Sequence, residues 1–475
     1  MQNTEPVWRL VEAKQDAYID LSDRVWDTPE LNFQELKSAR AHADMLREEG
    51  FRVVEGLAGM PTSVMGEAGE GGPVIAILGE YDALPGLSQE AGVAEHRPVA
   101  QGGSGHGCGH NLLGAGAMLA AAAVKDWLRE QGIEGRVRYY GCPAEEGGAG
   151  KTFMVRDGVF DDVDIAISWH PAPFAGVNEA HSLAILQVDY AFVGRAAHAA
   201  EAPELGRSGL DAAELMNIGV NYLREHMPSS ARIHYAHLES GGVAPNVVQA
   251  TTTLRYIVRA ADLPELQKLA ARVDKIAEGA ALMTETAVQR RVVSGMSNLL
   301  GNTPLEQAMF DNLQRLGPPP FDAEDRAFAE EIRRSVDQAD IDSAHQRFGI
   351  PVTDAPLCDR IVPLEARGAG MVGSTDVGDV SWAVPTVQMR GATYAIGTPG
   401  HSWQLTAQGK SKLAHKGMVH AAKTMAGTAV DVLSDAGLLA AARAEHAARL
   451  ARTPYESPLP DGLAPVLDMA SANER

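Results

Sequence analysis

The stretch Val74-Ile-Ala-Ile-Leu-Gly-Glu-Tyr-Asp82 is a short apolar run, partly β-branched, that ends in two acidic side chains. Such a run is typical of a strand that is covered on both faces. Polar residues directly after the strand lie at its carboxyl end, where ligands collect in open parallel sheets. The stretch therefore predicts an α/β protein with Glu80 and Asp82 at the functional edge of its sheet.

The same arrangement recurs at two more places along the chain. The predicted strand Arg136–Cys142 is followed by Glu145-Glu146, and the predicted strand Asp164–Trp169 is followed by His170. Helical segments lie between the strands, and strands that alternate with helices imply a parallel sheet. We therefore expect the polar residues after the three strands to meet in one crevice.

The rest of the catalytic domain is predicted to be mainly helical. We expect a strand at 384–389, a long weakly patterned connection at 340–372, and helices at 8–27, 34–49, 112–130 (with Asn111 as its N-cap), 151–157, 304–316, 323–339, 411–434 and 438–450. A proline-rich tail follows from Thr453.

A second domain is predicted inside the first. Its elements follow the order β-α-β-β-α-β, which is typical of a ferredoxin-like fold. We expect its strands at 184–194, 232–238, 251–258 and 284–293 and its helices at 208–226 and 263–283. The expected organisation is a catalytic domain of residues 1–183 and 296–475 with residues 184–295 inserted.

Composition limits the classes of function. The 475 residues include 41 Lys+Arg and 62 Asp+Glu, for a net charge of −21, which disfavours nucleic acid or an anionic membrane as a partner. Three cysteines argue against a disulfide framework and for a reducing compartment. We see no signal peptide, and the apolar stretch Leu112–Val124 is too short to cross a bilayer. The expectation is a soluble cytoplasmic protein.

A glycine-rich loop, Gly102-Gly-Ser-Gly-His-Gly-Cys-Gly-His-Asn111, precedes the long helix. Thiolate and imidazole are good ligands for a divalent ion, and a loop of this kind lets Cys108 and His110 reach one cation. A lone cysteine or histidine is more often a core residue, but here His106 and His110 flank Cys108 beside three strand ends. The glycines match no nucleotide-binding pattern, so a phosphate cradle is disfavoured.

The two residues of the acidic pair Glu145-Glu146 can have different roles in a hydrolytic metal site. One carboxylate can ligate a metal while its neighbour acts as a base toward water. The pair follows a strand whose sequence is typical of a buried strand. An isolated acidic pair is more often two solvated residues at the protein surface. His170 lies at a predicted strand end, and His401 lies in a Gly/Pro loop. Each is a candidate metal ligand, and each could instead be an ordinary hydrogen-bonded histidine.

These motifs together resemble the M20 metallopeptidase family, specifically its amidohydrolase branch with a Cys-Gly-His motif. The matching segments, which cover nearly the whole chain in order, are Glu80-Tyr-Asp82-Ala-Leu-Pro, His106–Asn111, Glu145-Glu146-Gly-Gly, Trp169-His170-Pro, Ala197-His198-Ala and His401. Within that branch the chain is most similar to the B-type p-aminobenzoyl-glutamate hydrolases. The resemblance implies an inserted domain that acts as a lid and mediates dimerisation.

The resemblance also implies roles for individual residues and a cofactor. It implies two divalent ions per chain, Zn²⁺ or Mn²⁺, held by Cys108, His110, Glu146, His170 and His401. It implies Glu145 as the general base, Asp82 as the carboxylate that orients a ligand, and His198 and Asn246 as lid residues that meet the scissile carbonyl and the substrate. It implies Arg259 as the grip on a substrate carboxylate.

The chain departs from the broader branch at three places. Asn111 stands where many members have Asp, Thr375 stands where many have Glu, and the segment Gly317–Ala369 looks like an insertion. The first two departures could change support of the metal ligands. The third could reshape the rim of the active site or the dimer contacts.

The sequence thus favours a metal-dependent amidohydrolase for an aromatic N-acyl amino acid, with p-aminobenzoyl-glutamate as the first candidate. The alternatives are a dipeptidase for unusual dipeptides such as β-alanyl ones, a non-catalytic partner subunit of a two-chain hydrolase and, more remotely, a deaminase. The expected assembly is a homodimer or a heteromer with a related subunit.

Overall fold

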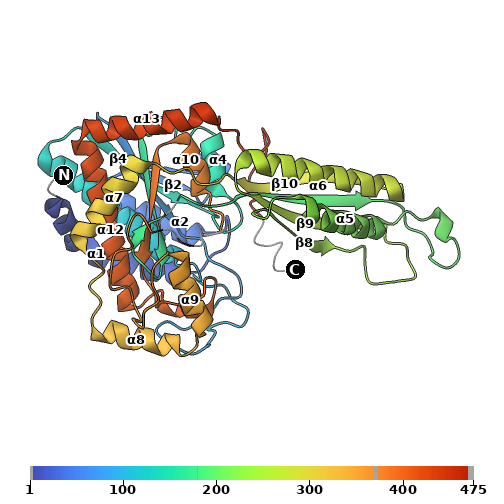
Figure 1. Ribbon diagram of the computed structural model, residues 1–475, viewed down its shortest axis with the longest axis horizontal. Coiled ribbons are helices and arrows are strands. Elements are labelled where there is room, and N and C mark those ends of the chain that lie inside the picture. The colour runs from blue at the N-terminus through green and yellow to red at the C-terminus, as the bar shows by residue number, and fades with distance from the viewer. Residues whose placement is uncertain (1–3, 179, 367, 369–372, 469–475) are drawn as a thin grey trace.

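The computed structural model describes residues 4–178, 180–366, 368 and 373–468. Two positions of the predicted insertion, 367 and 369, and the last seven residues of the predicted tail lie outside the described residues. In the described residues the strands form one seven-stranded and one four-stranded sheet. Figure 1 shows the four-stranded sheet and its two helices extending to one side of the larger body.

The seven-stranded sheet carries the strand ends that the sequence singles out. Its order is β1-β2-β4-β3-β5-β11-β6. The bounds are β1 Arg52–Glu55, β2 Val64–Glu70, β3 Val74–Glu80, β4 Gly135–Cys142, β5 Ile165–Ala172, β6 Gly176–Val177 and β11 Thr386–Ala392. The central strands β4, β3, β5 and β11 are parallel, as predicted.

The prediction of a parallel sheet is incomplete at both edges. β1 pairs antiparallel with β2, β2 pairs antiparallel with β4, and β6 pairs antiparallel with β11. The sequence Val64-Met-Gly-Glu-Ala-Gly-Glu70 gives only a weak strand pattern because two of its residues are glycine. β6 has two residues, which is too short for any periodicity to show.

Helices cover both faces of this sheet. The side chains of Ile75 and Ile77 pack in one core with α1, α3 and α12, and those of Val74 and Leu78 pack in a second core with α4 and α10. The helices are α1 Glu5–Trp26, α2 Leu36–Glu48, α3 His110–Gln131, α4 Gly150–Arg156, α7 Thr303–Leu316, α8 Ala323–Arg333, α9 Gln338–Arg347, α10 Val377–Ala383, α11 Trp403–Gln408, α12 Lys412–Ser434 and α13 Ala436–Arg452. All of β3 is buried, as its continuous apolar run predicts.

Four helix predictions need correction. Asn111 does not cap α3, because the helix begins at His110 and Gly109 occupies the N-cap position with a φ of 79°. The predicted helix 323–339 is two helices, α8 and α9, with extended backbone at Asp337 between them. α9 runs to Arg347, inside the predicted connection. The short helices α10 and α11 were not predicted.

The second sheet confirms the β-α-β-β-α-β order. Its strand order is β10-β7-β9-β8, and every pair in it is antiparallel. The elements are β7 Ala184–Val193, α5 Gly209–Leu223, β8 Arg232–Glu239, β9 Thr251–Ala260, α6 Leu263–Thr284 and β10 Ala287–Met296. β10 begins three residues later than predicted, because Glu285, with a φ of 54°, ends α6.

The described C-terminal segment packs on the protein. Leu459 is buried in the same core as the second sheet, and the Tyr455 hydroxyl donates a hydrogen bond to Asp379. Among the described residues no single helix is long and apolar enough to span a membrane. Only α12 and α13 taken together, across a bend of 98°, reach that length and composition.

Candidate metal centre and active site

Three strand ends and two loops supply the site. Asp82 follows β3, Glu145 and Glu146 follow β4, and His170 lies near the end of β5. Side chains from these strands meet because β4, β3 and β5 are parallel neighbours. Cys108 comes from the glycine-rich loop, and His401 comes from the loop before α11.

The predicted ligands gather in two adjoining clusters. Ligand atoms of Cys108, His110 and His170 lie within 4.8 Å of one another, and so do those of Cys108, Glu146 and His401. The Cys108 sulfur is 3.4 Å from the His170 Nε2, and the His401 Nε2 is 3.4 Å from a Glu146 oxygen. Both clusters include Cys108, so these residues would offer ligands to two neighbouring divalent cations.

Local backbone geometry turns these side chains inward. Gly109, in the left-handed region, starts α3 so that His110 is fully buried. Ala144 has a φ of 58° at the turn before Glu145. A Cβ on Gly148 would lie 2.4 Å from the Phe33 ring, so the loop after the acidic pair requires glycine there. His401 also adopts a left-handed φ of 53°, and its amide donates to the Gly107 carbonyl.

Hydrogen bonds fix which histidine nitrogen faces the site. The His110 Nδ1 is 2.8 Å from Asp82, and the His170 Nδ1 is 2.8 Å from the Pro171 carbonyl. Carboxylate and carbonyl oxygens only accept, so both Nδ1 atoms carry a proton, and in the neutral ring the lone pair is on Nε2. The other Asp82 oxygen accepts the backbone N–H of Glu146 at 2.9 Å. The Asp82 side chain therefore orients the His110 ring, and it holds the Glu145-Glu146 turn through the backbone N–H of Glu146.

The charge balance of the site fits divalent cations. The His110 Nε2 and one Glu146 oxygen are buried without a hydrogen-bond partner among the described residues. Burial, with Glu80 and Glu146 nearby, raises the pKa of Glu145 well above its ordinary value. Burial and Glu146 likewise raise the pKa of the Cys108 thiol. Such a crowd of acidic groups needs positive charge to ionise together, and a bound cation would supply it.

The ion pairs that Lys151 forms with Glu80 and Asp376 next to the site were not predicted from the sequence. Lys151, on α4, is fully buried and donates to Glu80 at 2.5 Å and to Asp376 at 2.7 Å. The second Glu80 oxygen lies 3.3 Å from the His110 Nε2. Lys151 therefore offsets part of the negative charge directly beneath the ligands. A buried lysine inside a short helix carries no sequence signal of this role.

Several predicted positions lie elsewhere. The His106 Nε2 is 3.0 Å from the Val25 carbonyl, so His106 does not join the ligands that flank Cys108. Asn111 donates to Ser22 and to the Gly409 carbonyl, and neither is a site residue.

The residues assigned to the inserted domain separate into two groups. Arg259 on β9 lines the site cavity, and burial lowers its pKa. His198 and Asn246 are exposed residues beyond the strands of the second sheet and do not line that cavity. The structure of one chain therefore does not bring them to the predicted ligands.

A cavity of about 360 Å³ opens on the predicted ligands. Its walls include Glu145, Arg259, Thr375 and Tyr394. Arg347 and Phe348, which belong to the predicted insertion, also line it. The predicted insertion thus reaches the site cavity, which is the first of the two consequences considered for it.

With this geometry in place, comparison with known proteins gives the family. The model of "Peptidase family M20/M25/M40" matches residues 76–431. The chain belongs to the M20 peptidase family. It is therefore a metal-dependent hydrolase, in agreement with the donor set of the site.

Individual relatives agree with this membership. The chain is 46% identical over 466 residues to one of the subunits of p-aminobenzoyl-glutamate hydrolase from Escherichia coli K12, covering 96% of this chain and 97% of that protein. It is 29% identical to the Xaa-Arg dipeptidase of Mus musculus over 90% of this chain and 89% of that protein. A solved dinuclear metal-binding M20 peptidase from Bacillus subtilis, 19% identical, shares the fold with a TM-score of 0.57 over 89% of this chain and 99% of its own.

Proposed function

We propose that this protein hydrolyses the amide bond of an aromatic N-acyl amino acid, with p-aminobenzoyl-glutamate as its substrate. The observation that carries the proposal is the two ligand clusters that share Cys108, with the Glu145 carboxylate 4.0 Å from the His110 Nε2 beside them. The relative that is 46% identical belongs to a p-aminobenzoyl-glutamate hydrolase, which supports the choice of substrate.

Five residues would hold two divalent ions, zinc or manganese: Cys108, His110, Glu146, His170 and His401. The thiolate favours zinc, while the carboxylate and imidazoles also suit manganese. When bound, the ions would polarise the amide carbonyl and make a water molecule acidic near neutral pH. Asp82 would keep the His110 ring oriented through its hydrogen bond to Nδ1.

Glu145 would move the proton in this mechanism. Its carboxylate would accept a proton from the attacking water and deliver it to the amide nitrogen as the C–N bond breaks. The Glu145 side chain is only 10% exposed, so its carboxylate is shielded from bulk water. Arg259, at the cavity wall, would bind the carboxylate of the amino-acid half by the paired geometry that guanidinium offers.

His198 and Asn246 would serve the site of a second chain. They lie beyond the ends of the second sheet and away from the cavity of their own chain. The proposal therefore includes assembly through the inserted domain, as a homodimer or as a heteromer with a related chain, at least in the active state. The relative that is 46% identical is named as one subunit of its hydrolase, which keeps the mixed assembly open.

A substrate panel with the purified, metal-loaded chain tests the proposal. We expect release of p-aminobenzoate from p-aminobenzoyl-glutamate, with slower or no hydrolysis of β-alanyl dipeptides and of dipeptides ending in arginine. The dipeptidase alternative gains support from the Xaa-Arg dipeptidase relative, and preferred cleavage of dipeptides would establish it instead. If the pure chain hydrolyses no N-acyl amino acid until a second protein is added, the alternative of a non-catalytic partner chain replaces the proposal.

A further inference from the structure

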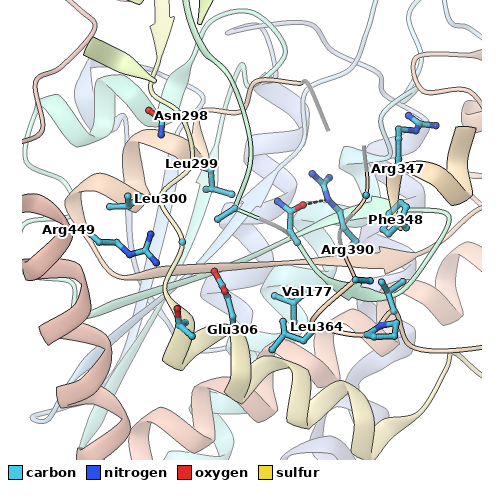
Figure 2. Close-up of a pocket in the computed structure, with 18 residues that line it drawn as sticks. Val177, Asn298, Leu299, Leu300, Glu306, Arg347, Phe348, Leu364, Arg390 and Arg449 are labelled. Atoms are coloured by element: carbon cyan, nitrogen blue, oxygen red, sulfur yellow. Dashed lines mark hydrogen bonds between the residues drawn. The ribbon is translucent and has the colours of Figure 1, made fainter. Parts of the chain in front are cut away.

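A second, larger cavity adjoins the site cavity. It has a volume of about 580 Å³, against about 360 Å³ for the site cavity. Four residues line both of them: Asn178, Arg347, Phe348 and Arg390. Figure 2 shows Arg347, Phe348 and Arg390 grouped on one side of the larger cavity. The junction between the two cavities is therefore formed by two arginines, an amide and an aromatic ring.

Arg390 is a buried cation without an acidic partner. Its side chain is 8% exposed, and its Nε donates to the Asn178 Oδ1 at 2.9 Å. It forms no ion pair with an aspartate or glutamate among the residues that the structure describes. Burial lowers the pKa of Arg390, and the more distant Glu145 and Glu80 offset this only in part. A charged group in such a place is costly unless an opposite charge is bound. The cavity wall at Arg390 is therefore suited to an anion.

A chain of amide hydrogen bonds orients this guanidinium. The Asn178 amide donates to the Gln388 side chain at 2.8 Å, and its backbone N–H donates to the Gln388 carbonyl at 2.8 Å. Gln388 in turn lies 3.5 Å from the Ser168 hydroxyl. Asn178 occupies Nε, and the two terminal nitrogens of Arg390 have no hydrogen-bond partner among the described residues, so they can bind a ligand. That edge of a guanidinium matches the two oxygens of a carboxylate.

Arg390 also lies at a suitable place along the substrate. β11 and β5 are parallel neighbours with Arg390 opposite His170, so the two backbones are about 4.8 Å apart. In a glutamate leaving group, four bonds of about 1.5 Å separate the amide nitrogen from the side-chain carboxyl carbon, a reach of about 5 Å. A carboxylate on Arg390 is thus compatible with an amide bond held near the predicted metal ligand His170.

Arg347 adds a second unpaired cation to the same junction. It is exposed, and its Nε donates to the Ser343 carbonyl of its own helix at 3.4 Å, while no ion pair of its guanidinium is found among the described residues. The neighbouring Phe348 packs against Phe174 with ring centroids 5.2 Å apart, which fixes the segment on the cavity wall. Both residues belong to the predicted insertion.

We infer that Arg390, oriented by Asn178 and assisted by Arg347, binds the side-chain carboxylate of an acidic amino acid in the leaving group. This inference rests on the proposed function and adds to it the residue that selects an acidic side chain, which extends the substrate class to amides of other dicarboxylic amino acids. Arg390 is on this view a specificity-determining residue, distinct from Arg259, which would bind the other carboxylate.

The test compares kcat/KM for p-aminobenzoyl-glutamate and p-aminobenzoyl-glutamine, whose side chains are alike in length but end in a carboxylate and a neutral amide. A hydrogen bond to a charged group contributes about 1.5–3 kcal/mol, so the wild type should prefer glutamate by roughly 10- to 100-fold. Arg390→Met should bring this ratio within about threefold of one, while Arg390→Lys should keep part of it. The exposed Arg360, paired with Asp359, provides a matched control, and Arg360→Met should keep the full ratio.

Loss of activity toward both substrates in equal proportion, with an unchanged ratio in Arg390→Met, would overturn the inference. If Arg390→Met does not fold, as judged by its melting curve, Asn178→Ala releases the guanidinium without removing it and should also lower the ratio. Calorimetric binding of free L-glutamate and L-glutamine to the metal-loaded protein separates the two proposals. Absence of any hydrolysis would refute the proposed function alone, whereas equal binding of the two amino acids by wild type would refute this inference.

Discussion

Replacing Lys151 by methionine should destabilise the protein in a pH-dependent way. Lys151 is fully buried between Glu80 and Asp376, and its Nζ lies 2.5 Å and 2.7 Å from their oxygens. Removing one partner of a buried ion pair costs about 3–5 kcal/mol, because the remaining charge stays buried and unpaired. Two carboxylates lose their partner here, so we expect a loss in free energy of unfolding toward the upper end of that range at pH 8.

The loss of unfolding free energy in Lys151→Met should depend on pH through Asp376. Burial raises the pKa of Asp376 to about 6 even though Lys151 lowers it. Without the lysine the folded-state pKa rises further, so the folded variant takes up protons that the unfolded chain does not. A carboxyl with a raised folded pKa loses stability as pH rises through that pKa. The deficit of Lys151→Met should therefore be smaller at pH 5 than at pH 8.

Urea unfolding of the metal-free protein, followed by circular dichroism at both pH values, measures the deficit. The control is Lys412→Met, which removes an ion pair with Glu324 whose side chains are 69% and 72% exposed, and it should match wild type at both pH values. The reasoning is refuted if Lys151→Met unfolds at the same urea concentration as this control at pH 8, or if its deficit grows on acidification.

Three further outcomes follow from the site and the core. Glu145→Gln should lower kcat by about 10²- to 10⁴-fold with unchanged metal content, measured by steady-state kinetics and elemental analysis. Asp82→Asn should weaken zinc binding by about 10- to 100-fold in a chelator competition, since an amide can replace only one of the two oxygens that accept from His110 and from the Glu146 N–H. Burial lowers the pKa of His420 to about 4 from 6.5, so the unfolded chain binds more protons below pH 6.5. Wild type should lose about 3 kcal/mol between pH 6.5 and 4 through this group, and calorimetry should show a smaller loss in His420→Gln.

The motifs that follow strands were predictable because they depend on local pattern. A buried strand reads as a continuous apolar run, and the residues after it must lie at its carboxyl end, as Asp82 does after β3. The β-α-β-β-α-β order of residues 184–296 was readable for the same reason. The strands β1, β2 and β6 were not, because β2 contains two glycines and β1 and β6, at four and two residues, are too short to show a period.

Side-chain partnerships across the chain depend on the tertiary structure. Lys151 and Asp376 are 225 positions apart, and Arg390 and Asn178 are 212 apart. Nothing in either local sequence marks the pairing. His106 shows the converse, since its motif suggested a ligand but the backbone turns its ring toward the Val25 carbonyl.

The sequence by itself determined the strand ends, the donor residues near them and the kind of ion that they suit, since periodicity and donor chemistry are local properties. Only the folded chain decided which donors meet, which cations have no counterion among the described residues and that His198 stands away from the cavity of its own chain. Distance, burial and unpaired charge arise from packing between segments far apart in sequence, and no local pattern records them.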